Sequence, residues 1–265
     1  MNTHNPKSLT ALRQAAATAL IAIAGPGALA AESVITASFG ADYSVGKYGR
    51  SERTETRYFP MMLKAESGPM TYKLTIPYVE VRGPADVVGA GDDTVVLGAA
   101  RPIRTAAGLG DVVAAASGEV WGDHESGWVV ELGGKIKFAT ADETKGLGTG
   151  RNDYSLFADV SKSFGKHSLF ATLGKRKMGD PAGVDYRDPW FGSLGWSQRL
   201  SDKTSAGLMI DLRQRLQAGG DPAQELTGFV SHKLDGGWKL QGYVVTGFTR
   251  SSPDLGLGAI LGYNF

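Results

Sequence analysis

Apolar and polar residues alternate along most of this chain. The stretch 254–265 shows the pattern: apolar residues occupy every second position, with small or polar residues between them, and Ile260 is the one interruption. A period of two predicts a β-strand with one apolar face and one small or polar face. Because the chain ends on this stretch, at Phe265, we expect a strand that is paired on both sides, as the closing strand of a barrel is.

The same pattern recurs and predicts about twelve strands. They cover approximately residues 35–47, 53–66, 72–78, 110–121, 127–140, 154–164, 168–178, 190–200, 204–216, 226–234, 238–248 and 254–265. The connections between them are alternately short and long. Outer-membrane barrels combine an even number of antiparallel strands with short periplasmic turns and longer extracellular loops, whereas sandwiches have shorter strands. The sequence therefore predicts an all-β fold, a transmembrane antiparallel β-barrel.

In the first half of the second predicted strand, the alternation of apolar and polar positions is out of phase with the second half. Arg53, Glu55 and Arg57 occupy positions that carry apolar residues later in the same strand. Either this half projects beyond the membrane or a β-bulge near Pro60 shifts the phase. The sequence leaves both alternatives open.

Aromatic residues gather near both ends of the predicted strands. Near the short turns are Tyr72, Trp128, Phe164, Trp238, Tyr263 and Phe265. Near the long loops are Tyr78, Phe138, Tyr154, Trp190 and Phe248. Two such girdles are typical of a barrel that meets both interfaces of a membrane.

The amino end predicts export. Lys7 and Arg13 precede a short apolar run, and 28–30 has the small-x-small pattern of a cleavage site. The run is too short for a membrane anchor, which needs about 20 apolar residues. We expect a signal peptide at 1–30, a barrel at 31–265, and a location in the outer membrane of a Gram-negative bacterium.

Composition excludes several kinds of site. The signal segment removes two of 28 basic residues, which leaves 26 against 27 acidic ones and argues against nucleic acid as a partner. The chain has no Cys and four scattered His, so structural disulfides and zinc sites of the usual spacing are not expected. Asp180, Asp185 and Asp188 lack the spacing of a calcium loop. The sequence predicts no cofactor and no metal.

Charged residues on the inner face are the candidate functional residues. Asp211, Arg213 and Arg215 occupy consecutive inward positions, where we expect them to face Arg199 and Glu225 of neighbouring strands. Glu131, Lys135 and Lys137 form a second inward row. Such rows select ions or polar solutes in channels, here with a mild preference for anions; a ladder of cross-strand ion pairs is the structural alternative.

The connection 83–109 is unusually long and partly apolar. It contains Val87-Val88 and Val95-Val96-Leu97, together with Arg101 and Arg104. Apolar residues of this kind are unfavourable in solvent, so the connection either folds into the barrel mouth as a constriction or covers the rim or a neighbouring subunit.

Several segments resemble a group of proteobacterial outer-membrane barrel transporters related to the MetA-pathway of phenol degradation family. They are 73–78 (KLTIPY), 108–113 (GLGDVV), 141–150 (ADETKGLGTG) with 153–155 (DYS), 179–185 (GDPAGVD) and 240–243 (LQGY). The resemblance spans nearly all of the mature chain. It implies an outer-membrane location and uptake of small, including aromatic, molecules, and it supplies no binding residues.

These observations favour a narrow channel for small polar or aromatic solutes. In a barrel of this size the bore is modest, so a closed structural or adhesive barrel is the alternative. A lipid hydrolase would need a His beside a Ser, or paired acids, at the outer rim; His124, His167 and His232 fall on the periplasmic side, so we expect no enzyme. The expected partners are outer-membrane lipid, a small solute, and the barrel-assembly machinery, which would bind the strand ending at Phe265.

Overall fold

The computed structural model describes residues 33–98, 101–123 and 125–265. The predicted signal peptide at 1–30 and His124 lie outside the described residues. The long strands are β1 (Ser33–Gly46), β2 (Thr54–Ser67), β3 (Met70–Pro84), β6 (Ile103–Leu109), β7 (Val113–Asp123), β8 (Trp128–Lys137), β9 (Asp153–Phe164), β10 (His167–Lys177), β11 (Trp190–Arg199), β12 (Thr204–Arg213), β13 (Ala223–Lys233), β14 (Trp238–Gly247) and β15 (Leu255–Asn264).

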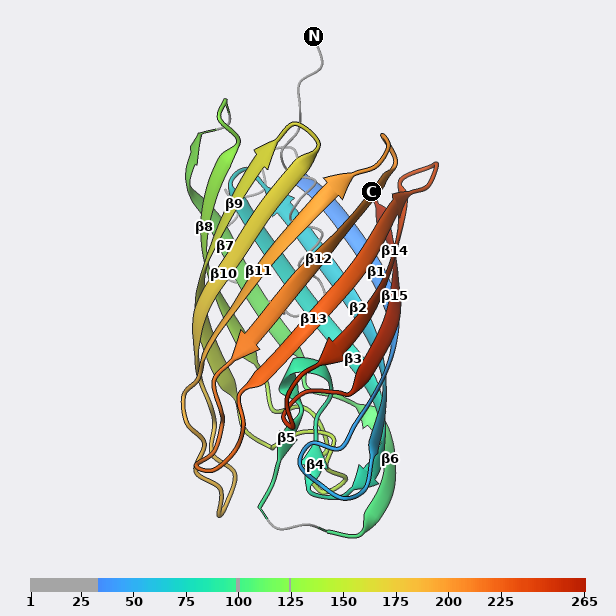
Figure 1. Ribbon diagram of the computed structural model, residues 1–265, viewed down its shortest axis with the longest axis vertical. Coiled ribbons are helices and arrows are strands. Elements are labelled where there is room, and N and C mark those ends of the chain that lie inside the picture. The colour runs from blue at the N-terminus through green and yellow to red at the C-terminus, as the bar shows by residue number, and fades with distance from the viewer. Residues whose placement is uncertain (1–32, 99–100, 124) are drawn as a thin grey trace.

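These strands close into an antiparallel barrel (Figure 1). β1 pairs with β2 on one side and with β15 on the other, and the remaining neighbours follow chain order. β6 and β7 pair with successive halves of β3 and form one interrupted barrel strand. The described residues therefore make a barrel of twelve strands, and the predicted fold class and closing strand are confirmed.

The connections alternate in length as predicted, which defines two ends of the barrel. The short turns that follow β2, β7, β9, β11 and β13 form the short-turn end, at the top of Figure 1. The longer connections that follow β1, β3, β8, β10, β12 and β14 form the long-loop end, at the bottom.

The predicted start of the fourth strand at Gly110 is wrong. β6 already pairs with the end of β3, from Leu109 opposite Tyr78 to Ile103 opposite Pro84. Small residues between Thr105 and Gly108 weaken the apolar alternation that identifies a strand from sequence, although backbone pairing needs no large side chain. The connection predicted at 83–109 is therefore shorter, and Arg104 lies on β6 rather than in a loop.

The first half of β2 projects at the long-loop end without a bulge. The register between β2 and β3 is continuous, from Ser67 opposite Met70 to Glu55 opposite Arg82. On the outer face of this extension Arg57 pairs with Glu80, with 3.1 Å between Nη1 and Oε2. Of the two alternatives left open by the sequence, projection beyond the apolar belt is the one observed.

The outer face of the barrel is apolar along its middle. Its exposed side chains include Phe39, Leu63, Leu132, Leu156, Leu173, Leu194, Leu208, Ile210, Val230, Val244 and Leu257. Both predicted aromatic groups lie at the ends of this belt, and Tyr263 contacts Trp238 and Phe265 with ring centroids 4.9 Å apart in each pair. Among the described residues no helix is long and apolar enough to cross a membrane.

The inner face carries aromatic rings as well as charges. Each of five inward rings lies directly opposite an inward glycine of an adjacent strand: Phe157 opposite Gly133, Phe191 opposite Gly174, Phe170 opposite Gly195, Phe229 opposite Gly207 and Tyr243 opposite Gly258. A Cβ atom on any of these glycines would overlap the ring. The glycines therefore let the rings lie flat against the wall, and the lumen keeps space that upright rings would fill.

We predict that Gly195→Ala destabilises the barrel. The Phe170 ring over Gly195 is packed with Met209 and Phe229 and cannot move aside freely. The added methyl group should lower the free energy of unfolding by about 1–3 kcal/mol, the usual cost of overpacking. Urea unfolding, followed by the heat-modifiable gel shift, measures this change.

Gly242→Ala is the matched control. Gly242 lies outside the inner face, and a Cβ atom there would meet nothing closer than 4.0 Å. Equal unfolding midpoints for the two variants would contradict the role of Gly195.

Candidate functional site

A short segment of the β3–β6 connection folds into the long-loop end of the barrel (Figure 1). In it β4 (Val87–Val88) pairs with β5 (Val95–Val96), and a 3₁₀ turn, η3 (Gly91–Asp93), lies between them. We call residues 85–98 the inserted segment. Gly89 has φ of 81°, in the left-handed region that glycine adopts without strain, which allows the tight reversal.

Apolar contacts hold both faces of the inserted segment. Val88 and Val95 pack against Met178 and Tyr186 of the β10–β11 connection. Ala90 belongs to a second cluster with Val79, Val81, Ala141 and Leu147. These contacts explain why an apolar connection is stable here, since the barrel wall and two other loops cover it.

The tip of the inserted segment meets a cation of the wall. The Asp93 carboxylate accepts a hydrogen bond from Arg176 of β10, with 2.9 Å between Oδ1 and Nη1, and the Arg176 side chain is only 5% exposed. Burial opposes ionisation of Asp93, but Arg176, and then Lys137, Lys135 and Arg213, outweigh it and lower the pKa of Asp93 below its ordinary value. Asp93 therefore stays charged and anchored.

A second set of contacts fixes the base of the inserted segment. Asp86 is fully buried; its Oδ2 lies 2.6 Å from Arg50 Nε, and its Oδ1 accepts a hydrogen bond from the backbone N–H of Arg101. Arg104 donates to the carbonyls of Val87 and Gly146, at 3.1 and 2.8 Å. Arg104 thus ties the inserted segment to the β8–β9 connection, while the Arg101 side chain is exposed.

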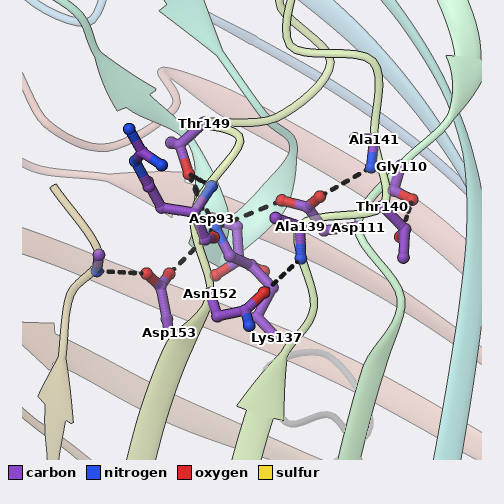
Figure 2. Close-up of polar contacts among 12 residues, drawn as sticks. Asp93, Gly110, Asp111, Lys137, Ala139, Thr140, Ala141, Thr149, Asn152 and Asp153 are labelled. Atoms are coloured by element: carbon purple, nitrogen blue, oxygen red, sulfur yellow. Dashed lines mark hydrogen bonds and ion pairs between the residues drawn. The ribbon is translucent and has the colours of Figure 1, made fainter. Parts of the chain in front are cut away.

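Lys137 crosslinks the wall to two loops (Figure 2). Its Nζ lies 3.3 Å from Asp111 and 3.0 Å from Asp153, and all three side chains are buried. Asp111 accepts the backbone N–H of Ala141, and Asp153 that of Gly179. For Lys137 the geometry matches the structural alternative, a buried ion-pair network, rather than a free charge in a pore.

A cavity lies inside the barrel, on the side of the inserted segment that faces the short-turn end. Three bases and three acids line it: Lys135, Arg176, Arg213, Asp159, Asp211 and Glu225. The rings of Phe157 and Phe191 line it as well, and Lys135 Nζ lies 6.0 Å from the centre of the Phe191 ring. Its volume is about 100 Å³. This lumen cavity is the candidate functional site.

The structure brings together some of the predicted site residues and separates others. Asp211 lies directly opposite Glu225, and Arg213 follows on the same face of β12. The expected contact with Arg199 is wrong, because antiparallel pairing places Arg199 opposite Ser205, at the short-turn end. Arg215 lies beyond β12 and is exposed, outside the cavity wall.

The second predicted row, Glu131, Lys135 and Lys137, has one member in the cavity wall and two outside it. Lys135 lines the lumen cavity and Lys137 belongs to the ion-pair network. Glu131 lies opposite Glu119 and Asp159, nearer the short-turn end, and is not part of the cavity wall. The roles of all these residues in selectivity stay predictions.

Sequence reasoning missed Tyr48, Phe157 and Phe191 in the cavity wall, and Asp93 beside it in the inserted segment. The two Phe residues stand at inward positions of their strands, so strict counting along β9 and β11 would have found them. Asp93 and Arg176 are 83 residues apart, and no local pattern joins them.

The imidazoles at the short-turn end have aromatic and hydroxyl neighbours. His167 stacks between Phe164 and Trp196, and Nδ1 of His232 lies 2.8 Å from the Thr204 hydroxyl.

No family model matches this chain, and no curated protein matches its sequence. The COG4313 outer membrane channel from Pseudomonas putida F1 has a TM-score of 0.67 at 11% identity, over 92% of this chain and 100% of that chain. The KdgM porin in complex with disordered oligogalacturonate has a TM-score of 0.52 at 10% identity, over 86% and 99%. The translocator domain of the autotransporter NalP from Neisseria meningitidis has a TM-score of 0.51 at 11% identity, over 88% of this chain and 88% of that chain. This chain thus has the fold of outer-membrane barrels.

We predict that Asp93→Asn loosens the inserted segment. The change removes the charge that Arg176 binds, and a hydrogen bond between charged groups contributes about 1.5–3 kcal/mol. In a Val95→Cys background, where the thiol is buried and is the chain's one cysteine, labelling by dithiodipyridine should become about tenfold faster or more. Asp235→Asn, which breaks an exposed pair with Lys203, is the control; an equal change in both variants would contradict the anchor.

Acid should also loosen the inserted segment in protein that keeps Asp93, because it protonates the carboxylate that Arg176 binds. Because the pKa of Asp93 is lowered in the folded protein, its contribution is present above the ordinary value of 3.8 and is lost as the pH falls through the lower folded value. Labelling of Val95→Cys should therefore stay slow in mild acid and rise only below pH 3.8. Dithiodipyridine still reacts with thiols in acid, so the profile is measurable; a rise near neutral pH would exclude Asp93 as the anchor.

Proposed function

We propose that this protein is a narrow channel of the bacterial outer membrane for small polar or aromatic solutes. The observation that carries the proposal is the lumen cavity, where three acidic and three basic side chains and the rings of Phe157 and Phe191 face the inside of a barrel with an apolar exterior. Ionised groups are costly to bury without water or partners, so a charged inner wall favours a hydrated path.

The geometry supports small solutes. The inserted segment and the loops around it narrow the long-loop end, and the lumen cavity, of about 100 Å³, has room for small solutes only. Flat rings at Phe157 and Phe191 offer contact to apolar or aromatic solutes, and the charged groups offer contact to polar ones. The motif resemblance to transporters related to the MetA-pathway of phenol degradation family supports the same solute class.

The barrel neighbours support the membrane setting. Two of the solved structures of this fold are described as an outer membrane channel and as a porin. In this setting the short-turn end faces the periplasm, the apolar belt contacts outer-membrane lipid, and β15 with Phe265 is the strand that the barrel-assembly machinery would bind.

A closed structural barrel is the second candidate. The observation in its favour is the extent of ion pairing around the inserted segment, including Asp86 with Arg50 and Lys137 with two acids. A barrel closed in this way would carry no current, so one experiment separates the two functions.

Planar-bilayer recording of the folded, heat-modifiable protein tests the proposal. We expect discrete conductance steps with a mild preference for anions, because Arg213 lines the lumen cavity and also a second cavity at the long-loop end, whose walls include Arg50 and Arg250. Arg213→Glu should shift the reversal potential toward cation selectivity. Arg215→Glu makes the same charge change at an exposed position outside the lumen and should leave the reversal potential unchanged. Silence from folded protein would favour the closed barrel.

A further inference from the structure

Tyr48 has an unusual backbone conformation at the long-loop end. It follows β1 and has φ of 50°, and it is the one non-glycine residue with positive φ in the part of the chain that the structure describes. A side chain in the left-handed region is strained, and such residues persist where surrounding contacts hold them.

Those contacts are visible on both sides of the Tyr48 ring. The residue is 8% exposed, and a Cβ atom on Gly46 would lie 3.2 Å from Tyr48 Cε2, so the ring packs close to the end of β1. The side chains of Ser44 of β1 and Thr94 of the inserted segment lie near its hydroxyl group and favour the ionised form, against the effect of burial on its pKa. Burial, and then the charge of Glu225, raise the pKa of Tyr48, so the phenol keeps its proton and can donate to either hydroxyl.

Three cavities meet at this ring. The lumen cavity shares Tyr48, Arg213 and Ser251 with a mouth cavity, whose other walls include Gln217 and Gly98. The mouth cavity shares Tyr48, Arg50 and Arg250 with an outer opening between the β1–β2, β12–β13 and β14–β15 connections. Tyr48 is the one residue that lines all three of these cavities.

We infer that Tyr48 is the size-determining residue of the transport path, where its ring separates the mouth cavity from the lumen cavity. This inference rests on the proposed channel function. Rotation of the ring away from Ser44 and Thr94 joins the two cavities, and the strained backbone at Tyr48 favours such a departure once the contacts with these side chains are lost. Solutes that fit past the ring enter the lumen, and larger ones stay in the mouth cavity.

Two substitutions separate the ring from its hydroxyl group. Tyr48→Gly removes the ring and also the backbone strain, so the variant should fold. Liposome swelling with sugars of graded size should become several-fold faster, and sugars that the parent protein excludes should now pass. Tyr48→Phe keeps the ring and removes only the hydroxyl group. This variant should keep the size limit but switch between open and closed current levels more often in bilayer recordings.

Arg53→Gly is the control, because Arg53 is exposed in the same β1–β2 connection and lines none of the three cavities. An independent readout uses Ser193→Cys, which places the chain's one thiol in the lumen cavity. A membrane-impermeant thiol reagent added from the long-loop side should label this thiol several-fold faster in the Tyr48→Gly background than in a background that keeps Tyr48.

Two results would overturn the inference, and they differ in what else they exclude. If the parent protein passes small sugars and Tyr48→Gly leaves both the size limit and Ser193→Cys labelling unchanged, Tyr48 does not determine size although the channel function stands. If neither the parent nor Tyr48→Gly conducts and the Ser193→Cys thiol stays unreactive in both, removal of the ring opens nothing and the channel function fails as well.

Discussion

The contact between Asp93 and Arg176 connects the inserted segment with the wall of the lumen cavity. It joins the tip of the inserted segment to the inner wall of the barrel, with 2.9 Å between the two groups and the Arg176 side chain buried. Without it the inserted segment would retain its apolar packing against Met178 and Tyr186 but lose its link to β10. The position of the inserted segment therefore depends in part on a charge pair, and a charge pair, unlike apolar packing, responds to pH through titration of its carboxylate.

The barrel wall and the loops shape different parts of the lumen. In the wall, inward rings lie flat over glycines such as Gly195 and Gly207, which leaves space in the middle of the barrel. At the long-loop end, buried ion pairs centred on Asp86 and Lys137 hold the connections in place. The result is a small cavity with charged and aromatic walls just inside a narrow entrance at the long-loop end, an arrangement suited to small solutes rather than to free diffusion of large ones.

The fold was largely predictable from the sequence, because a period of two and alternating loop lengths are local signals. β6 was not, since its small residues hide the alternation while its backbone still pairs with β3. The candidate site was predictable only in part. Asp211, Arg213 and Glu225 were placed correctly as neighbours, but Arg199 was not, because antiparallel register sends it to the opposite end. The anchor at Asp93 depends on tertiary contacts that no local pattern encodes.

The proposed channel function requires that solutes cross the barrel through the lumen cavity, and blocking that cavity tests the requirement most directly. Thr172→Cys places a thiol in the cavity wall, and Leu173→Cys places one on the exposed outer face of the same strand. Single-channel current should be recorded before and after each thiol reacts with a bulky reagent. We predict a stepwise loss of current for Thr172→Cys and none for Leu173→Cys. An unchanged current after complete modification of Thr172→Cys would contradict passage through the lumen cavity.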